Sequence, residues 1–183
     1  VIWTSILRRT EPAANAGDFW MACLLYWGMF LPLGDMLSID SLLKKKTKHT
    51  TRSLASAAFL SQVLAMYLYA GISKLQGDWL NGSAVGYVLS VHDHGTWVGE
   101  FLNASKITTG FLTISTLLLE IGGPFLFLFC GNRSARRLIA LSFILFHIGI
   151  WITLSVGLFS PIGITAWLAL MPWHTKRTQP DME

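Results

Sequence analysis

Uncharged runs of membrane-spanning length constrain this sequence more than any other feature. The clearest run, Ser53 to Ser73, contains about 21 residues without Asp, Glu, Lys or Arg, and the next residue is Lys74. A helix rises about 1.5 Å per residue, so this run covers roughly 30 Å, the thickness of the hydrocarbon core of a bilayer. The sequence therefore predicts a transmembrane helix that carries an amine to the membrane boundary.

The composition agrees with a membrane protein. Of the 183 residues, 52% are hydrophobic and only 13% are charged, whereas an ordinary soluble domain has about 25% charged residues. The mean hydropathy is +0.50. The formal net charge is +4, and most basic residues lie in short connectors, so membrane lipid is the expected partner and nucleic acid is not. The length predicts one transmembrane domain, residues 1–175, followed by a polar tail, residues 176–183.

Three further apolar segments predict more helices of the same bundle. Pro32 ends or kinks the first segment, a Gly-Gly-Pro sequence at 122–124 interrupts the second, and Ser160-Pro161 divides the third. Residues 76–106 are mixed in character and predict short amphipathic helices, at the interface or folded back over the bundle. The expected fold class is an all-α integral membrane protein with about four transmembrane helices plus interfacial and half-length helices. The expected spans are 19–34, 53–75, 107–129 and 138–159, with a half-length helix at 162–171.

Two basic connectors, residues 41–52 and 132–137, determine the expected orientation. Positively charged loops remain on the cytoplasmic side, and an alternating count of the spans puts both connectors on that side. The end of the central helix that carries Lys74 is then expected on the non-cytoplasmic side. Trp20 and Trp27 suit membrane interfaces, where tryptophan is enriched.

Lys74 has two interpretations. A lysine at the end of a span can extend to the lipid headgroups and pair with Asp78, four residues later. Alternatively, partial desolvation makes a neutral amine available as a base. In that case the small residues Ala70 and Gly71, one turn earlier on a face shared with Tyr67, leave room for a flat ligand.

Glu120 and His147 are the other ionisable groups of interest inside expected spans. In a structural interpretation, Glu120 is a carboxyl group that is buried in its neutral form or paired with a neighbouring helix. In a functional interpretation, Glu120 pairs with Lys74 or forms a hydrogen bond with a ligand hydroxyl. His147, near the middle of its span, is either a helix–helix hydrogen-bonding group or a ligand contact. The sequence His-Asp-His at 92–94 suits a metal only on an extended strand, and no third ligand is near, so no metal site is expected.

Three segments together resemble a known superfamily. GISKLQGDWLNG at 71–82 resembles the segment around the active-site lysine of vitamin K-dependent gamma-glutamyl carboxylases. LFHIGIWITLSVGLF at 145–159 resembles the histidine-containing span of the same superfamily. WGMFLPLGDMLSID at 27–40 resembles a segment of its bacterial branch, the horizontally transferred transmembrane (HTTM) proteins. The three matches occur in the same order and span most of the chain, so the resemblance implies a protein of the bacterial inner membrane.

The resemblance also implies a chemistry. Lys74 matches the family lysine that deprotonates vitamin K hydroquinone, and His147 matches the family's membrane histidine. In the family the quinol reacts with dioxygen to give a basic alkoxide, which removes a gamma proton from peptidyl glutamate before carbon dioxide adds. A menaquinol-type lipid quinol is the implied cofactor, and a peptide glutamate is a possible substrate. With Lys74 as the catalytic residue, the residues expected to contact substrate or quinone are Tyr69, Asp78, Trp79, Glu120 and His147.

Departures from the family leave two functions open. Family carboxylases carry a large extramembrane domain and earlier spans that this sequence lacks, so we expect the chain to be part of a longer one. The first function is an enzyme of carboxylase or quinol-epoxidase type, and the second is a non-catalytic quinone- or lipid-binding scaffold or partner subunit. An enclosed cavity lined by Lys74, Glu120 and His147 favours the enzyme. A solvated pair of Lys74 with Asp78 and no cavity favours the scaffold.

Overall fold

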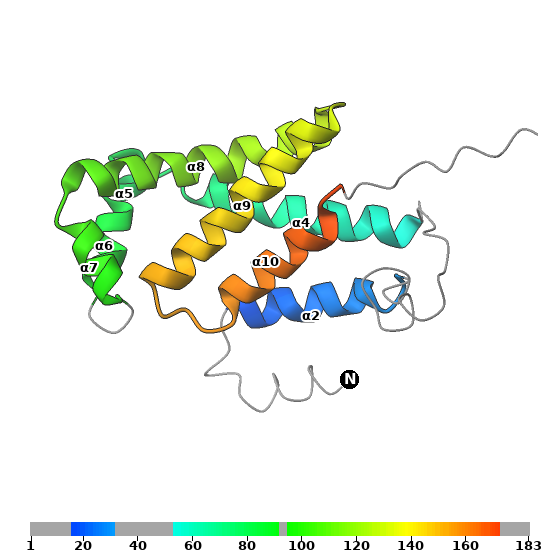
Figure 1. Ribbon diagram of the computed structural model, residues 1–183, viewed down its shortest axis with the longest axis horizontal. Helices are drawn as coiled ribbons and strands as arrows, with labels where there is room; N and C mark the ends of the chain where they lie inside the picture. The colour runs from blue at the N-terminus through cyan, green and yellow to red at the C-terminus, as the bar shows by residue number, and fades with distance from the viewer. Residues whose placement is uncertain (1–15, 32–52, 92–94, 173–183) are drawn as a thin grey trace, which may run out of the picture.

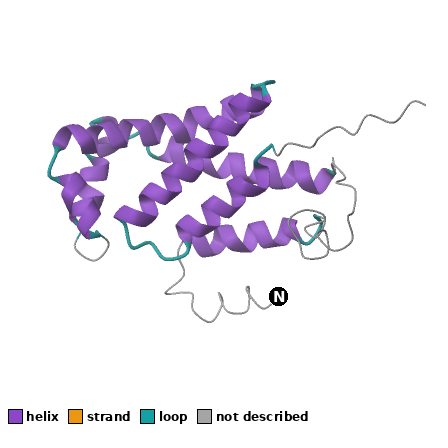
Figure 2. Cartoon of the chain, viewed as in Figure 1, coloured by secondary structure: helices purple, strands orange, loops and turns teal. Residues whose placement is uncertain are grey.

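The computed structural model describes residues 16–31, 53–91 and 95–172, and these ranges are almost entirely helical (Figures 1 and 2). No strand occurs among these residues, and one isolated bridge joins Gly95 to Leu154. The predicted all-α fold class is confirmed. The helices are α2 (Ala16–Gly28), α4 (Leu54–Ser73), α5 (Gly77–Leu80), α6 (Ala84–Ser90), α7 (Trp97–Asn103), α8 (Lys106–Phe129), α9 (Arg133–Thr153) and α10 (Phe159–Leu170).

Within the described ranges, three helices are long and apolar enough to cross a membrane. These are α4, α8 and α9, with 20, 24 and 21 residues, which match a hydrocarbon core of roughly 30 Å. Two shorter apolar helices, α2 with 13 residues and α10 with 12, pack against them. The predicted bundle of about four spans with half-length helices is therefore confirmed, although the first expected span forms a helix shorter than a full crossing.

The central helix begins where the sequence predicts. The Ser53 hydroxyl accepts a hydrogen bond from the backbone N–H of Ser56 at 3.1 Å, and the Ser56 hydroxyl accepts one from the N–H of Ser53 at 3.0 Å. This reciprocal cap satisfies N–H groups that the first turn of a helix leaves without partners. At the other end the helix finishes at Ser73, and Lys74 is its C-terminal cap.

The predicted break of α8 at Gly-Gly-Pro is wrong, because the helix continues through Pro124. Proline lacks the N–H that would bond the carbonyl of Glu120, four residues earlier, but helices inside a membrane bundle tolerate such a gap. Gly123 lies directly against the ring of Phe143 in α9, where an added Cβ would come within 2.6 Å of the ring. This close packing of α8 on α9 supports the segment in its helical conformation.

The last apolar segment divides earlier than predicted. α9 ends at Thr153, and a turn containing Gly157, with a φ of 60°, leads into α10. Glycine adopts this left-handed conformation without steric cost. Ser160-Pro161 therefore lies in the first turn of α10, where the missing N–H of proline is not needed by the helix.

The arginines expected in the 132–137 loop instead belong to the start of α9. The side-chain oxygen of Asn132 accepts a hydrogen bond from the backbone N–H of Ser134 at 2.9 Å and caps the helix. Arg136 lies over the ring of Phe127, 4.5 Å from its centroid. The Nε of Arg137 donates to the carbonyl oxygen of Pro172 at 2.8 Å. These contacts tie the start of α9 to the end of α8 and to the segment after α10.

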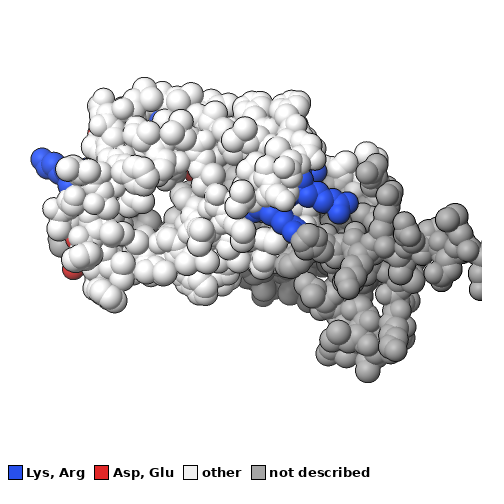
Figure 3. Space-filling model, turned by 45° about the horizontal axis from the view of Figure 1, so that its top comes forward, with Lys and Arg blue, Asp and Glu red and all other residues white. Residues whose placement is uncertain are grey.

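The helix ends gather at two sides of the molecule (Figure 1). The short helices α5, α6 and α7 lie at one end of the long axis, together with the end of α4 and the start of α8. The starts of α4 and α9 lie at the opposite end. In Figure 3, Lys and Arg side chains appear toward the two ends, and the surface between them is nearly uncharged.

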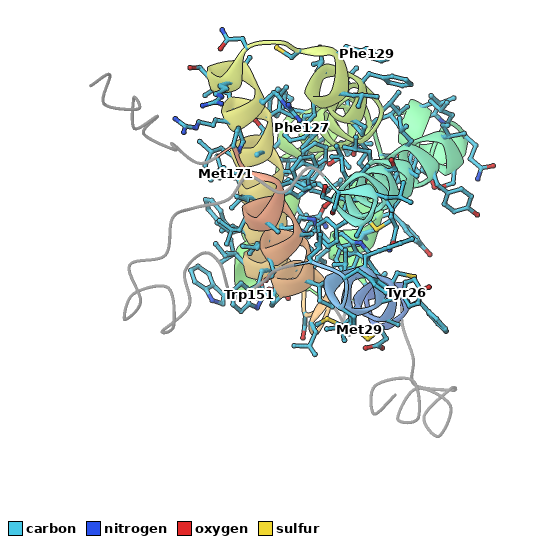
Figure 4. All side chains as sticks on the ribbon, turned by 90° about the vertical axis from the view of Figure 1, so that its right-hand side faces the viewer. Tyr26, Met29, Phe127, Phe129, Trp151 and Met171 are labelled. Atoms are coloured by element: carbon cyan, nitrogen blue, oxygen red, sulfur yellow. The ribbon has the colours of Figure 1, made fainter. Side chains whose placement is uncertain are left out.

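Large apolar side chains cover the outside of the bundle. Figure 4 shows Phe127 inside the bundle and Phe129, Tyr26 and Trp151 on its outside, in agreement with their burial and exposure. So extensive an apolar surface suits contact with lipid rather than with water.

The core is aromatic and joins five helices, α2, α4, α8, α9 and α10. Phe143 of α9 and Trp167 of α10 stack with ring centroids 4.1 Å apart, and Tyr67 of α4 packs on Phe143 at 4.5 Å. Trp20 of α2 meets Tyr67 edge to face at 5.9 Å and is buried. Trp20 therefore belongs to the core of the bundle.

Candidate functional site

Lys74 forms an ion pair with Glu120. Its Nζ donates a hydrogen bond to Glu120 Oε2 at 2.6 Å, and the side chains are 21% and 6% exposed. The Nζ also lies 5.0 Å from the centroid of the Trp79 ring, within the range of a cation–π contact. The alternative pairing with Asp78 is not formed, since Asp78 accepts a hydrogen bond from the Ser83 hydroxyl at 3.0 Å.

The absence of a side chain at Gly71 brings the two charges together. A Cβ added at Gly71 would come within 2.6 Å of Ile121 Cγ1 and 3.2 Å of the Cβ of Glu120. Small residues allow this close approach of membrane helices. Gly71 lies one turn before Lys74, so the contact of α4 with α8 places Glu120 beside the amine.

A cavity of about 1090 Å³ lies beside this ion pair. Side chains from every described helix line it, and most of them are apolar. Among the described residues of its lining, only Lys74 and Glu120 carry a charge. The space-filling view shows the surface hollowed between the end formed by α5 to α7 and the rest of the molecule (Figure 3). The site therefore combines a large apolar space with one charged position in its wall.

The structure brings most of the expected site residues together. Tyr69, Trp79 and Glu120 line the cavity with Lys74, whereas Asp78 is exposed on α5 and does not. His147 is fully buried and does not line the cavity either. The His-Asp-His sequence at 92–94 lies outside the described residues.

Tyr67 is a site residue to which the sequence assigned no role. It lines the cavity, and its hydroxyl is hydrogen-bonded to Nε2 of His147 at 2.6 Å. Tyr67 thus stands between the buried histidine and the cavity. The face that Tyr67 shares with Lys74 was evident from the seven-residue spacing, but its partner lies 80 positions away in the sequence.

Two more contacts fix the position of His147. Gly163 of α10 lies so close to the imidazole that an added Cβ would overlap the ring. The ring of Phe159 also packs against the imidazole, with the two ring centroids 5.4 Å apart. Both residues come from the half-length helix α10, so this helix holds the histidine against Tyr67.

Comparison with known protein families agrees with this membrane architecture. The family model of the HTTM domain matches residues 18–173, which is most of the chain. The chain belongs to the HTTM domain family. The match confirms the resemblance that the three sequence segments indicated, and with three apolar spans the chain is a membrane protein of the HTTM type.

No solved structure matches this HTTM protein. The geometry of its site is therefore described from its own residues. That geometry has three elements: the paired Lys74 and Glu120, the mostly apolar cavity beside them, and Tyr67, which lines the cavity and is hydrogen-bonded to the buried His147 behind it.

Proposed function

We propose that the cavity binds a lipid quinol and that Lys74 acts as a base toward a ring hydroxyl. The observation that carries this proposal is the position of the Lys74 amine, which lies in the wall of a large apolar cavity and touches a buried carboxylate. A base must be within hydrogen-bond reach of the proton that it removes. A flat ring in this cavity, with its hydroxyl toward Lys74, meets that requirement.

The cavity suits a menaquinol-type ligand in size and polarity. Its volume of about 1090 Å³ lies slightly above the usual range for ligand pockets, about 300–1,000 Å³. Apolar walls suit a fused ring and an isoprenoid chain, and the Trp79 ring offers an aromatic face beside the amine. The three spans place the chain in a membrane, where such a ligand dissolves.

Glu120 gives the proton a second position. An ammonium–carboxylate pair and a neutral amine–carboxylic acid pair hold the same number of protons. Burial of the two side chains away from water disfavours the charged pair, so the free-energy difference between the two forms becomes smaller. In the neutral pair, the amine of Lys74 accepts a proton from the ligand hydroxyl. The ammonium that forms is balanced by the ligand oxyanion, and it also donates a hydrogen bond to the protonated Glu120, whose Oε2 lies 2.6 Å away.

A bound quinol would supply the electrons for reduction of dioxygen, as the resemblance to the carboxylases implies. Epoxidation and carboxylation of a peptide glutamate are the reactions that this chemistry supports. The arginines at the start of α9 and Lys74 at the end of α4 lie at opposite ends of the bundle. We propose that the arginine end is cytoplasmic, in a bacterial inner membrane, and that the Lys74 end faces the other side.

One observation favours a second candidate function. An amine that is held as an ammonium by a carboxylate at 2.6 Å is not available as a base. The chain would then be a non-catalytic quinone- or lipid-binding scaffold, or a partner subunit of an enzyme. This alternative requires ligand binding in the same cavity but no proton transfer at Lys74.

Substitution of Lys74 separates the two functions. The purified protein in nanodiscs is supplied with reduced menaquinone and dioxygen, and epoxide is measured by chromatography. Lys74→Ala and Lys74→Arg are both expected to abolish product, because arginine keeps the charge but does not serve as a base. Unchanged turnover in either variant contradicts the base assignment, and quinone binding without any wild-type turnover supports the scaffold.

A further inference from the structure

The buried pair of Tyr67 and His147 has no part in the proton transfer proposed for Lys74. The two side chains come from α4 and α9, and their polar atoms are 2.6 Å apart. Tyr67 is 2% exposed and His147 is 0% exposed. Burial of two polar groups in an aromatic core requires a compensating hydrogen bond. The question is which group donates it.

The unpaired nitrogen of His147 answers this question. Its Nδ1 is buried and has no hydrogen-bond partner among the described residues. A buried N–H without an acceptor is a rare defect in proteins, so a neutral ring is better accommodated with its proton on Nε2. A doubly protonated ring also carries a proton on Nε2. In both cases Nε2–H donates to the Tyr67 oxygen, and the hydroxyl proton of Tyr67 is available to another acceptor.

Tyr67, which carries this proton, contributes to the wall of the ligand cavity. Tyr67 lines this cavity together with Lys74, and the two residues are seven positions apart on one helix face. The helix rise puts their positions about 10 Å apart along α4. The para oxygens of a quinone are about 5 Å apart, and two hydrogen bonds of about 2.8 Å extend this span to about 11 Å. The backbone positions of the two residues are therefore far enough apart along α4 for one ring ligand to present an oxygen to each side chain.

We infer that the Tyr67 hydroxyl donates a hydrogen bond to the second oxygen of the cavity ligand, while the first oxygen contacts Lys74. His147 is a positioning residue that accepts no proton from Tyr67 and directs the tyrosine proton toward the cavity. The ligand class is accordingly a para-quinone or para-quinol rather than any apolar lipid of similar size. This inference rests on the proposed function, because it takes the ligand to be a quinone or quinol.

The test compares two ring ligands that differ in the second oxygen. The probes are 2,3-dimethyl-1,4-naphthoquinone, followed by quenching of tryptophan fluorescence, and 1-tetralone, followed by its competition with the quinone. Trp20 and Trp79 line the cavity and report binding. The single oxygen of 1-tetralone is expected at Lys74, because hydrogen bonds to a charged group are the stronger ones.

Tyr67→Phe is expected to weaken quinone binding about 3- to 10-fold, the usual effect of one hydrogen bond. Its effect on 1-tetralone is expected to be less than about 2-fold, and this ligand also reports that the variant is folded. His147→Leu removes the group that orients the Tyr67 hydroxyl. This variant is therefore also expected to weaken binding of the quinone more than binding of 1-tetralone. The matched control is Tyr87→Phe, which removes a hydroxyl from an exposed tyrosine outside the cavity lining.

Equal effects of Tyr67→Phe on the two ligands, or no effect on either, would overturn the assignment of Tyr67 while leaving the proposed function intact. Should Tyr67→Phe fail to fold, the ratio of the two affinities in His147→Leu decides the question by the same criterion. Absence of binding of either probe to the wild-type protein would contradict the proposed function itself, and the assignment with it.

Discussion

Lys74 and Glu120 are 46 positions apart in the sequence, yet the amine nitrogen of one lies 2.6 Å from a carboxylate oxygen of the other. The first ends α4 and the second lies within α8. A charged side chain inside a membrane protein costs a few kcal/mol unless it is paired. Each residue therefore stabilises the other, and their pair forms the charged part of a mostly apolar cavity wall.

The ion pair predicts strongly non-additive effects on stability. Glu120→Leu removes one partner and leaves a mostly buried ammonium, so the free energy of unfolding in detergent is expected to fall by about 2–4 kcal/mol. Adding Lys74→Met to this variant removes the unpaired charge and is expected to restore most of the loss. Denaturant or thermal unfolding of the wild type, the two single variants and the double variant measures these changes in the free energy of unfolding. Losses that simply add in the double variant would show that the pair makes no energetic contribution.

The contact at Gly71 predicts a difference between two glycines. Gly71→Ala would put a methyl group within 2.6 Å of Ile121, and overpacking of this kind costs about 1–3 kcal/mol. Gly122→Ala is the matched control, because a Cβ there meets nothing within 4 Å and alanine favours a helix by about 0.5–1 kcal/mol. Unfolding in detergent is the measurement. Equal stability of the two variants would contradict the close approach of α4 and α8.

Filling the cavity is expected to block the ligand without unfolding the protein. Gly149 lines the cavity, and a Cβ at this position meets nothing within 4 Å. Gly149→Leu is therefore expected to weaken quinone binding at least about 10-fold while the unfolding midpoint changes little. Gly122→Leu, in open space outside the cavity lining, is the control and should bind normally. Normal quinone binding by Gly149→Leu would place the ligand elsewhere.

The proposed orientation is tested by labelling single cysteines in intact cells. In a background of Cys23→Ser and Cys130→Ser, Gly131→Cys marks the arginine end and Asn81→Cys marks the Lys74 end; both sites are exposed. A maleimide that does not cross membranes is expected to label Asn81→Cys in intact cells and Gly131→Cys only after the cells are opened. The reverse pattern would invert the orientation.

Local patterns predicted much of the fold. The uncharged run after Ser53 predicts α4 and the position of Lys74, because length and polarity alone decide whether a helix spans a membrane. The proline rules were less successful. Pro124 lies within a continuous helix, since packing on neighbouring helices outweighs the lost hydrogen bond, and Pro161 lies in the first turn of α10, where no hydrogen bond is lost.

The contacts of the site were predictable only in part. Lys74 and Trp79 share one segment, so their contact follows from it. Pairing of Lys74 with Asp78 assumed one continuous helix, but α4 ends at Ser73 and α5 starts at Gly77, where φ is 49°. Pairing of Glu120 with Lys74 was one of the interpretations that the sequence left open, and the structure shows this pair. Nothing local in the sequence selected it, and nothing identified His147 as the partner of Tyr67.

The most direct test of the account is a structure of the protein in nanodiscs with added menaquinone. We predict density for a flat ring in the cavity, with one ring oxygen within about 3.2 Å of the Lys74 amine. An empty cavity, or a ring bound away from Lys74 on the outer surface of the bundle, would contradict the account.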